Sequence, residues 1–438
     1  MGIRNVTPSR RWRVRSLLRA AAILAASVPL SAFAQEPSRP TATLDQAITQ
    51  ALIHDPRIVQ ARGAEDSAAA AQKAALGNYL PKLSASASAG ASQTNVPSAS
   101  SVGGSASAGI SLGYDVFTGF RRGAESAQAD AQAEGADADL SAKRAAVALG
   151  VEQTFYTALQ AKELLEVANA RQQSAQAGLD AAKRKAAAGL GTKSDELRAE
   201  VELNSAQQAV LEANTQADTQ AFALGRQMGV DGPVNAQVDA SAQVVDPAFD
   251  AKAFMAELLG TAPELVAARE QSIAATAGVS AAKSSYLPQV TASAGYDWST
   301  RLDPAFPGNA GWSVRVGISF PIFDGFARDE SLTRAEAQQR TAEATVEDTQ
   351  RALRATAEQL AGQLALAQAK IPLAEKSVAA AEEDLRAQQQ RYDNGVSTML
   401  ELLTSQTGAT EAKTALVQAR FDCRLAYAQL LSLAGRAS

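Results

Sequence analysis

Residue types that could perform acid–base, nucleophilic or metal chemistry are scarce in this chain of 438 residues. His54 is its one histidine and Cys423 its one cysteine, so neither has a second residue of its kind with which to share a metal. The acidic run at residues 382–384 is typical of a solvated helix face. We find no phosphate-binding loop, zinc-protease helix motif or dinucleotide fingerprint. The sequence therefore predicts no enzymatic activity, no catalytic residue, no metal and no cofactor.

Two short stretches combine turn residues with a helix-capping pattern at matched positions. The turn residues are Gly189, Leu190 and Gly191 in one stretch and Gly395, Val396 and Ser397 in the other. Thr192 with Asp195, and Thr398 with Glu401, have the three-residue spacing of a capping box. Capping by itself accounts for both acids, and helix termination by itself accounts for both glycines. The pattern predicts two helix–turn–helix tips, 206 residues apart.

An internal duplication of the sequence must position these tips. Residues 79–81 (Tyr-Leu-Pro) recur at 286–288, an offset of 207, and residues 117–120 (Phe-Thr-Gly-Phe) recur in part at 323–326, an offset of 206. Landmarks that stay in register over such a distance indicate two copies of one plan. We predict a signal segment over residues 1–34, a first repeat over 35–228, a linker over 229–250 and a second repeat over 251–438.

The first 34 residues have the layout of a secretory signal peptide. Six arginines and no acid accompany an apolar run from Leu17 to Leu30, with small residues at Ala32 and Ala34. That run is too short to span a bilayer. The Ser9-Arg10-Arg11 sequence leaves both the general and the twin-arginine export route open. Removal of the segment would change the net charge from −5 to −11, which argues against a nucleic-acid partner.

Alanine-rich stretches predict unusually long helices. The chain has 98 alanines and only 5% aromatic residues, which favours closely packed helices over a large rounded core. We expect a first helix from Thr43, capped by Gln46, to Tyr79. Long helices are expected over residues 123–187 and 326–391, the second kinked at Pro372. Each would be roughly 100 Å long, which implies a helical barrel or a coiled coil.

Four segments alternate apolar and polar side chains with a period of two. They cover residues 83–92, 106–114, 290–298 and 312–320. This length and pattern are typical of transmembrane β-strands that face lipid on one side and a lumen on the other. Tyr114, Trp298, Trp312 and Phe320 fall at strand ends, as in an aromatic girdle. A soluble, half-buried sheet would show the same alternation, but the export signal favours a membrane.

Four strands are too few to close a barrel in lipid, where open sheet edges are not tolerated. Two copies of the chain would supply eight strands and a filled interior, whereas three would supply twelve and an open lumen. We therefore predict an α+β membrane protein: a homotrimer in which a long helical barrel is joined to a transmembrane β-barrel with four strands per protomer. The alternative is an exported coiled-coil scaffold without a channel.

Several features together resemble the TolC-like outer-membrane efflux family: the signal segment, the duplicated plan, residues 320–326 (Phe-Pro-Ile-Phe-Asp-Gly-Phe), Arg391-Tyr392 with Gly395, and residues 401–403 (Glu-Leu-Leu). The resemblance covers residues 43–434. It implies a trimeric channel-tunnel in outer-membrane lipid, with its helical barrel in the periplasm. It also implies a periplasmic adaptor and an inner-membrane pump as partners. Multidrug efflux and type I protein secretion both stay open, as does the cargo.

The same resemblance implies roles for the residues of the two tips. Residues 189–191 and 395–397 would meet the tips of the adaptor. Asp195 would bond to Tyr392 and so hold the periplasmic entrance closed. Glu401 would lie in a constriction that selects cations.

Two residues depart from the family pattern at the entrance. Ser397 stands where a second latch has Arg, and Thr404 stands where the constriction has a second acid. Both changes predict an entrance that is less tightly latched and less selective for cations. Three Glu401 carboxylates in one ring would repel one another, which predicts some pKa values above the ordinary value of about 4.3.

Overall fold

The computed structural model describes residues 39–96, 99–237, 250–301 and 308–436. The predicted signal segment and most of the predicted linker lie outside these residues, and the unit described here begins at Arg39. None of the helices within the described ranges combines the length and the hydropathy of a membrane span.

The described elements follow the same order twice. The first set is β1 (Thr41–Ala42), α1 (Leu44–His54), α2 (Pro56–Gly77), β2 (Lys82–Val96), β3 (Ala99–Phe117), α3 (Arg121–Ala187) and α4 (Lys193–Gln227). The second set is β4 (Asn235–Ala236), α5 (Ala251–Thr261), α6 (Pro263–Lys283), the 3-10 turn η2 (Ser284–Tyr286), β5 (Gln289–Arg301), β6 (Asn309–Ser319), α7 (Ala327–Asp393) and α8 (Met399–Leu433). Both α3 and α7 have 67 residues, and both α4 and α8 have 35. The predicted duplication is confirmed, and the exact boundaries of the repeats stay a prediction.

The first predicted helix is in fact two helices. Thr43 and Gln46 form the expected capping box, but α1 ends before Asp55, which is extended, and α2 begins at Pro56. Proline restricts the residue before it and lacks an N–H, whereas the Asp55 carboxylate caps the new helix by accepting from the N–H of Arg57 at 2.8 Å. By contrast, α7 continues through Pro372 as one helix, and the kink there stays a prediction.

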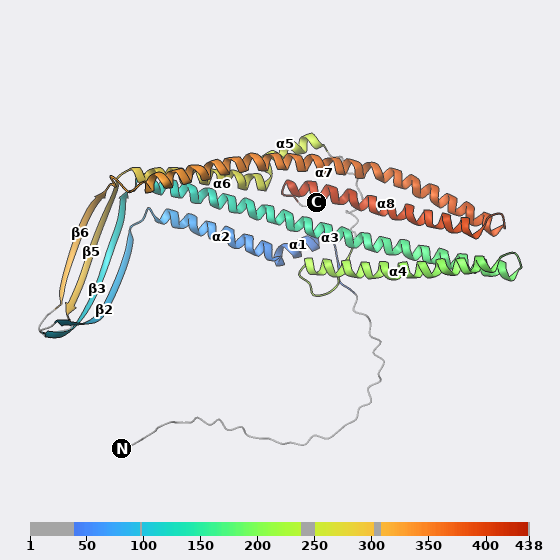
Figure 1. Cartoon of the computed structure of the whole chain (residues 1–438), viewed down its shortest axis with the longest axis horizontal. Helices are drawn as coiled ribbons and strands as arrows, with labels where there is room; N and C mark the ends of the chain where they lie inside the picture. The colour runs from blue at the N-terminus through green and yellow to red at the C-terminus, as the bar shows by residue number, and fades with distance from the viewer. Residues whose placement is uncertain (1–38, 97–98, 238–249, 302–307, 437–438) are drawn as a thin grey trace, which may run out of the picture. The chain divides into compact units, whose positions relative to one another are not determined.

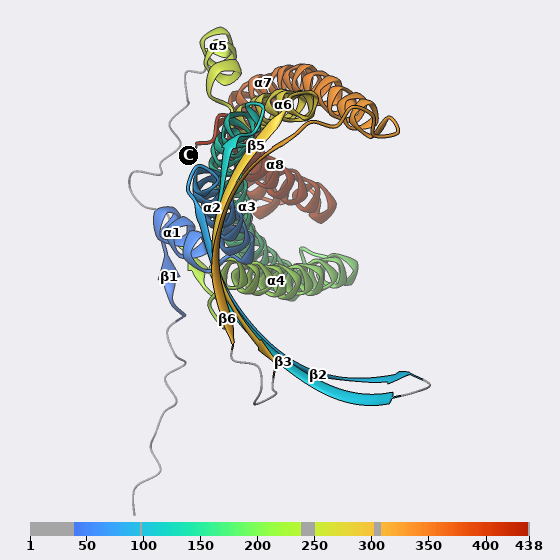
Figure 2. The ribbon, with the colours of Figure 1, turned by 90° about the vertical axis from the view of Figure 1, so that its left-hand side faces the viewer.

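The four long strands form one antiparallel sheet in the order β2-β3-β5-β6. They have between 11 and 19 residues and are longer than the predicted segments. β6 begins earlier than predicted but ends at Ser319, so Phe320 lies just outside it. Figure 2 shows that this sheet is strongly curved, with β2 and β6 as the edges of its hydrogen-bonded order. The backbone N–H and C=O groups along the outer sides of β2 and β6 have no strand of the described chain to pair with in this sheet. They are therefore available to pair with strands of another chain.

The helices form two antiparallel hairpins, α3 with α4 and α7 with α8, that lie side by side through contacts of α3 with α8 (Figure 1). The sheet lies at one end of this helical body, and the turns of both hairpins lie at the other. Two tips that are 206 residues apart in sequence are thereby brought to the same end of the molecule.

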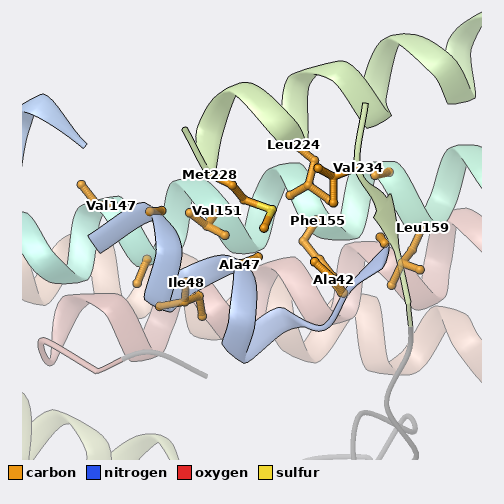
Figure 3. Close-up of a cluster of buried hydrophobic side chains, with 14 of the residues drawn as sticks. Ala42, Ala47, Ile48, Val147, Val151, Phe155, Leu159, Leu224, Met228 and Val234 are labelled. Atoms are coloured by element: carbon orange, nitrogen blue, oxygen red, sulfur yellow. The ribbon is translucent and has the colours of Figure 1, made fainter. Parts of the chain in front are cut away.

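A buried apolar cluster fixes the middle of the helical body. It joins α1, α3, the end of α4 and the short parallel pair β1–β4, with a contribution from α8. Phe155, Leu224 and Val234 point toward one another at its centre (Figure 3). Two further clusters lie between α5, α6, α7 and α8, and near the helix tips. Small alanines fill much of each cluster, which allows the long helices to pack closely.

Candidate functional site

The first helix tip is a glycine-closed turn between α3 and α4. Gly189 has φ 74°, and the N–H of Leu190 donates to the carbonyl of Lys185 at 2.9 Å. This bond pattern ends a helix with a left-handed residue, which glycine adopts at little cost. A Cβ on Gly189 would meet nothing within 4 Å, so the turn needs glycine for its backbone and not for lack of space. Leu190 is 81% exposed at the apex.

The second tip repeats this geometry between α7 and α8. Gly395 also has φ 74°, and the N–H of Val396 donates to the carbonyl of Arg391 at 2.9 Å. Val396 is 68% exposed. The structure thus gives the two predicted tips one form, each with an exposed aliphatic side chain at its apex. Their role in docking an adaptor stays a prediction.

Both predicted capping boxes are present. The Asp195 N–H donates to Thr192 Oγ1 at 3.2 Å, and the Thr192 N–H donates to the Asp195 carboxylate at 3.3 Å. The corresponding distances for Glu401 and Thr398 are 3.3 and 3.1 Å. Each acid therefore lies at the N-terminus of a 35-residue helix, where the helix dipole favours a negative charge.

Tyr392 is buried where the four helices of the two tips meet. Its residue is 5% exposed, and it packs in a cluster with alanines and leucines of α3, α4 and α8. Lys185 Nζ lies 3.8 Å from the centre of the Tyr392 ring and donates to the Tyr392 carbonyl. The pKa of the Tyr392 phenol is raised above its usual value. Burial is the largest cause, and the negative charges of Asp195 and Asp393 add to it.

The Asp195 carboxylate therefore lies close enough to the neutral Tyr392 phenol for its negative charge to oppose ionisation of the phenol. The Asp195 carboxylate is hydrogen-bonded to Thr192, and it acts on the Tyr392 phenol through its charge. A direct hydrogen bond between the phenol and Asp195 stays a prediction. Sequence reasoning missed Lys185 as the residue that holds Tyr392. The available signal was its match to Arg391 across the repeats, which marks both positions as basic in the last helical turn.

Glu401 is exposed and held by its neighbours. The Ser397 hydroxyl donates to Glu401 Oε2 at 2.5 Å. This bond, the N–H of Thr398 and the charge of Arg391 together lower the pKa of the Glu401 carboxyl. Within one chain the direction is opposite to that expected from a ring of three carboxylates. The Ser397 hydroxyl thus has a local partner where the family pattern has Arg.

Thr404 lies one turn beyond Glu401 and is also exposed. Its hydroxyl donates to the Leu400 carbonyl at 2.9 Å. Its hydroxyl is thus bonded within its own helix. Because threonine is uncharged, Thr404 adds no negative charge to that of Glu401. The placement of both residues in a constriction stays a prediction.

The sheet at the opposite end has one apolar and one polar face, as its alternation predicted. Leu83 pairs with Leu112, which pairs with Ala294, which pairs with Val314. One residue along, the polar face carries Ser84, Ser111, Gly295 and Ser313 in register. Serines also pair across this face, as between Ser84 and Ser111 at 2.7 Å. The apolar side chains on the other face remain largely exposed in the single chain.

Metal-binding side chains form no cluster in the part of the chain that the structure describes. Over the described ranges, no three or more His, Cys, Asp and Glu side chains are arranged to hold a metal ion. His54 is exposed at the end of α1, and Cys423 is buried in the cluster of α8. Paired helical hairpins that end in a sheet with one exposed apolar face and one polar face favour the class of membrane-inserted proteins.

The match to a known family is direct. Residues 47–230 and 255–436, one stretch in each repeat, match the family described as outer membrane efflux protein, and the chain belongs to this family. Membership places the protein in the outer membrane and confirms the predicted resemblance. The predicted combination of long helices with a four-stranded sheet in a duplicated plan is also confirmed, and the trimer stays a prediction. The family description agrees with the predicted transport role and with the prediction of no enzymatic activity.

Similar proteins include the solvent efflux pump outer membrane protein SrpC of Pseudomonas putida, 30% identical over 285 residues. That match covers 62% of this chain and 58% of SrpC, so the chain spans less than two thirds of this relative. Protein CyaE of Bordetella pertussis is 26% identical over 402 residues, or 89% of this chain and 83% of CyaE.

Solved structures show the same fold. VceC of Vibrio cholerae aligns with a TM-score of 0.76 at 21% identity, over 90% of this chain and 96% of VceC. The MtrE channel of Neisseria gonorrhoeae aligns with a TM-score of 0.75 at 19% identity, over 90% of this chain and 88% of MtrE. At such identities the likeness concerns the fold alone.

Proposed function

We propose that this protein is the outer-membrane exit duct of a tripartite efflux or type I secretion system and acts as a passive homotrimeric channel. The observation that supports this most directly is the open four-stranded sheet, whose apolar side chains share one face and whose Ser and Gly residues share the other. Such a sheet presents one face to lipid and the other to water.

The need to close the four-stranded sheet into a barrel is the reason for proposing three copies of the chain. The backbone groups along β2 and β6 need partners in lipid, and a copy of the chain offers β6 to β2. Three copies supply twelve strands and leave a lumen, whereas two would leave an interior that side chains fill. The polar face of Ser, Gly and Thr would line this lumen.

The helical body extends the duct toward its partners. The two tips expose Leu190 and Val396 at the end farthest from the sheet. An exposed aliphatic side chain on a rigid turn suits contact with another protein. We therefore assign the tips to a periplasmic adaptor, through which the channel works with an inner-membrane pump. Because SrpC is named for solvent efflux, small apolar solutes are the first cargo to test.

An exported coiled-coil scaffold would use the same helices. It would leave unexplained a sheet that exposes Trp312, Val314 and Val316 on one face. A soluble sheet buries such a face against a second layer, and Figure 1 shows the sheet extending beyond the ends of the helices.

The proposal is tested with the full chain purified from outer membranes in detergent. We expect trimers by native mass spectrometry and discrete conductance steps in planar bilayers. Val314→Arg, on the apolar face, should block membrane assembly, because Arg facing lipid costs about 2–4 kcal/mol at the bilayer midplane. Ser313→Arg, its neighbour on the polar face, should assemble and alter conductance. Monomers without conductance, or equal effects of the two variants, would contradict the proposal.

A further inference from the structure

The junction between the sheet and the long helices carries exposed aromatic residues in an unusual backbone conformation. Phe120 and Phe326 have φ 69° and 68°, and each follows a glycine with positive φ. A left-handed conformation costs a residue with a side chain roughly 1–2 kcal/mol. Both rings are nevertheless well exposed, and each contacts a second Phe edge to face. Exposed aromatics at the end of lipid-facing strands are typical of a membrane–water interface.

Each repeat has an arginine at the second position of its long helix, and the first repeat has a further arginine, Arg121, immediately before it. Arg122 and Arg328 occupy matched positions, 206 residues apart. Arg122 lies 5.0 Å from the ring centre of Tyr79, and Arg328 lies 5.0 Å from that of Tyr286. The two repeats thus build the same stack of an arginine on a tyrosine.

The repeats differ in the counter-ion of this arginine. In the second repeat, Asp324 accepts from the Arg328 N–H at 3.2 Å and pairs with Arg328 Nε at 2.8 Å. In the first repeat, Thr118 occupies the matched position, and its Oγ1 accepts only from the Arg122 N–H, at 3.4 Å. The capping bond is therefore shared by the two repeats, and the capping residue carries a negative charge in the second alone.

The hydrogen-bonding capacity of the Arg122 guanidinium is consequently only partly used. Its Nη2 donates to the Val116 carbonyl at 3.2 Å, while its Nη1 is buried and has no hydrogen-bond partner among the described residues. The nearby Glu125 carboxylate interacts with Arg121 at 3.5 Å and with Asn78 at 3.4 Å. A half-buried guanidinium with one buried, unpaired nitrogen and no carboxylate partner in the described part of the chain favours an anion from outside the chain.

A cavity next to Arg122 can admit that anion. It has a volume of about 420 Å³. It is lined by Tyr79, Phe117, Thr118, Phe120, Arg122 and neighbouring small residues. Arg122 also lies 5.7 Å from the ring centre of Tyr114, which belongs to the apolar face of the sheet through its pairing with Ala292. The cavity therefore lies on the side of the sheet that would face lipid.

We propose that this cavity binds the phosphate headgroup of an anionic phospholipid from the periplasmic leaflet of the outer membrane. Arg122 supplies the positive charge, Tyr79 and Phe120 flank the headgroup, and the acyl chains follow the apolar face of the sheet. The matched position in the second repeat does not bind such a lipid, because Asp324 already neutralises Arg328. The proposal rests on insertion of the sheet into the membrane, as the proposed function requires.

The test uses the full chain reconstituted with equal amounts of phosphatidylglycerol and phosphatidylcholine and then washed with detergent. Native mass spectrometry counts the lipids that each chain retains. We expect wild-type protein to retain phosphatidylglycerol preferentially. Thr118→Asp should reduce that preference to parity, because it supplies the counter-ion that the second repeat already has. Thr118→Asn is the matched neutral control and should keep the preference.

Two further variants separate the site from general charge effects. Arg122→Gln should lose the preference, whereas Arg328→Gln should keep it. Trimers and conductance that persist in Thr118→Asp would show that the channel stands without the lipid site, so the two proposals fail separately. Equal retention of the two lipids by wild-type protein, or an undiminished preference in Thr118→Asp, would overturn the proposal. Displacement of phosphatidylglycerol by excess inorganic phosphate would also overturn it, in favour of a free-phosphate site.

Discussion

The Lys185 ammonium contacts both the aromatic ring and the backbone carbonyl of Tyr392. The ammonium lies 3.8 Å from the centre of the ring and donates to the carbonyl oxygen of the same residue. Lys185 belongs to α3 in the first repeat and Tyr392 to α7 in the second. The contact therefore ties the two helical hairpins together beside their tips, and an entrance that opens by separating the hairpins has to break it.

Removal of this tie should loosen the entrance. A cation–π contact contributes about 0.5–2 kcal/mol, so Lys185→Met should raise the single-channel conductance in planar bilayers. Lys183→Met, at an exposed position of the same helix, is the control and should conduct as the wild type does. Identical conductance of the two variants would show that the Lys185 contact does not restrain the entrance.

The Tyr392 phenol provides a pH-dependent test of the latch. Burial and the charge of Asp195 raise its pKa above the usual value of about 10. The stabilisation from the neutral phenol is therefore complete below pH 10 and is lost as the pH rises through the raised pKa. Wild-type conductance should increase over that alkaline window, because an ionised phenol repels Asp195. Tyr392→Phe should start from a higher conductance, since it lacks the hydroxyl, and should not show this increase.

The sequence predicts the elements well where the signal is local. Capping boxes depend on a three-residue spacing and the sheet faces on a two-residue period, so both follow from short stretches such as Thr192 with Asp195. Pro56 also carried a local signal, because an Asp before a Pro favours a new helix start. The tie between Lys185 and Tyr392 lacks one. It joins residues 207 apart and exists only because two long hairpins lie side by side.

The two tips should be sensitive to the chemistry of their apices. Leu190→Lys and Val396→Lys replace exposed aliphatic side chains, so they should leave trimers intact and reduce cross-linking to the adaptor and export. Lys162→Glu, an exposed change on α3 far from the tip, is the control. Normal export from a double Leu190→Lys, Val396→Lys variant would count against docking at the tips.

The turn glycines allow a second, conformational test of the tips. Gly189 and Gly395 have positive φ, and a Cβ added at either position would meet no other atom within 4 Å. Asn tolerates this conformation better than other residues, so Gly189→Asn should preserve export. Gly189→Trp and Gly395→Trp should abolish export while trimers remain in the membrane. Loss of trimers in these variants would instead point to a folding defect.

Cysteine labelling should distinguish the two faces of the sheet. The single native Cys423 is buried, so introduced thiols can be read against a low background. Cysteines at Ser84, Ser107, Thr291 and Ser313 should react with a water-soluble maleimide in intact membranes. Cysteines at Ala87 and Val316, on the apolar face, should not react. Equal labelling of both faces would refute a barrel with a polar lumen.

The hydrogen bond from Ser397 should set the pH at which the entrance loses its cation preference. This bond is the largest cause of the lowered pKa of Glu401. Because the pKa is lowered, the carboxylate is charged at the ordinary glutamate pKa of about 4.3 and above. It loses its charge only as the pH falls through the lower pKa. The ratio of cation to anion permeability, measured in bilayers from neutral pH down to about 3, should follow this titration.

Ser397→Ala should move the midpoint of that titration to higher pH, whatever repulsion the three carboxylates of a trimer add. Thr404→Ala is the matched control, because the Thr404 hydroxyl bonds to the Leu400 carbonyl and not to Glu401, and its midpoint should equal that of the wild type. Glu401→Gln should abolish the titration. If Ser397→Ala and wild-type protein share one midpoint while Glu401→Gln removes it, the Ser397 bond is absent from the assembled channel. If the titration survives in Glu401→Gln, another acid selects the ions.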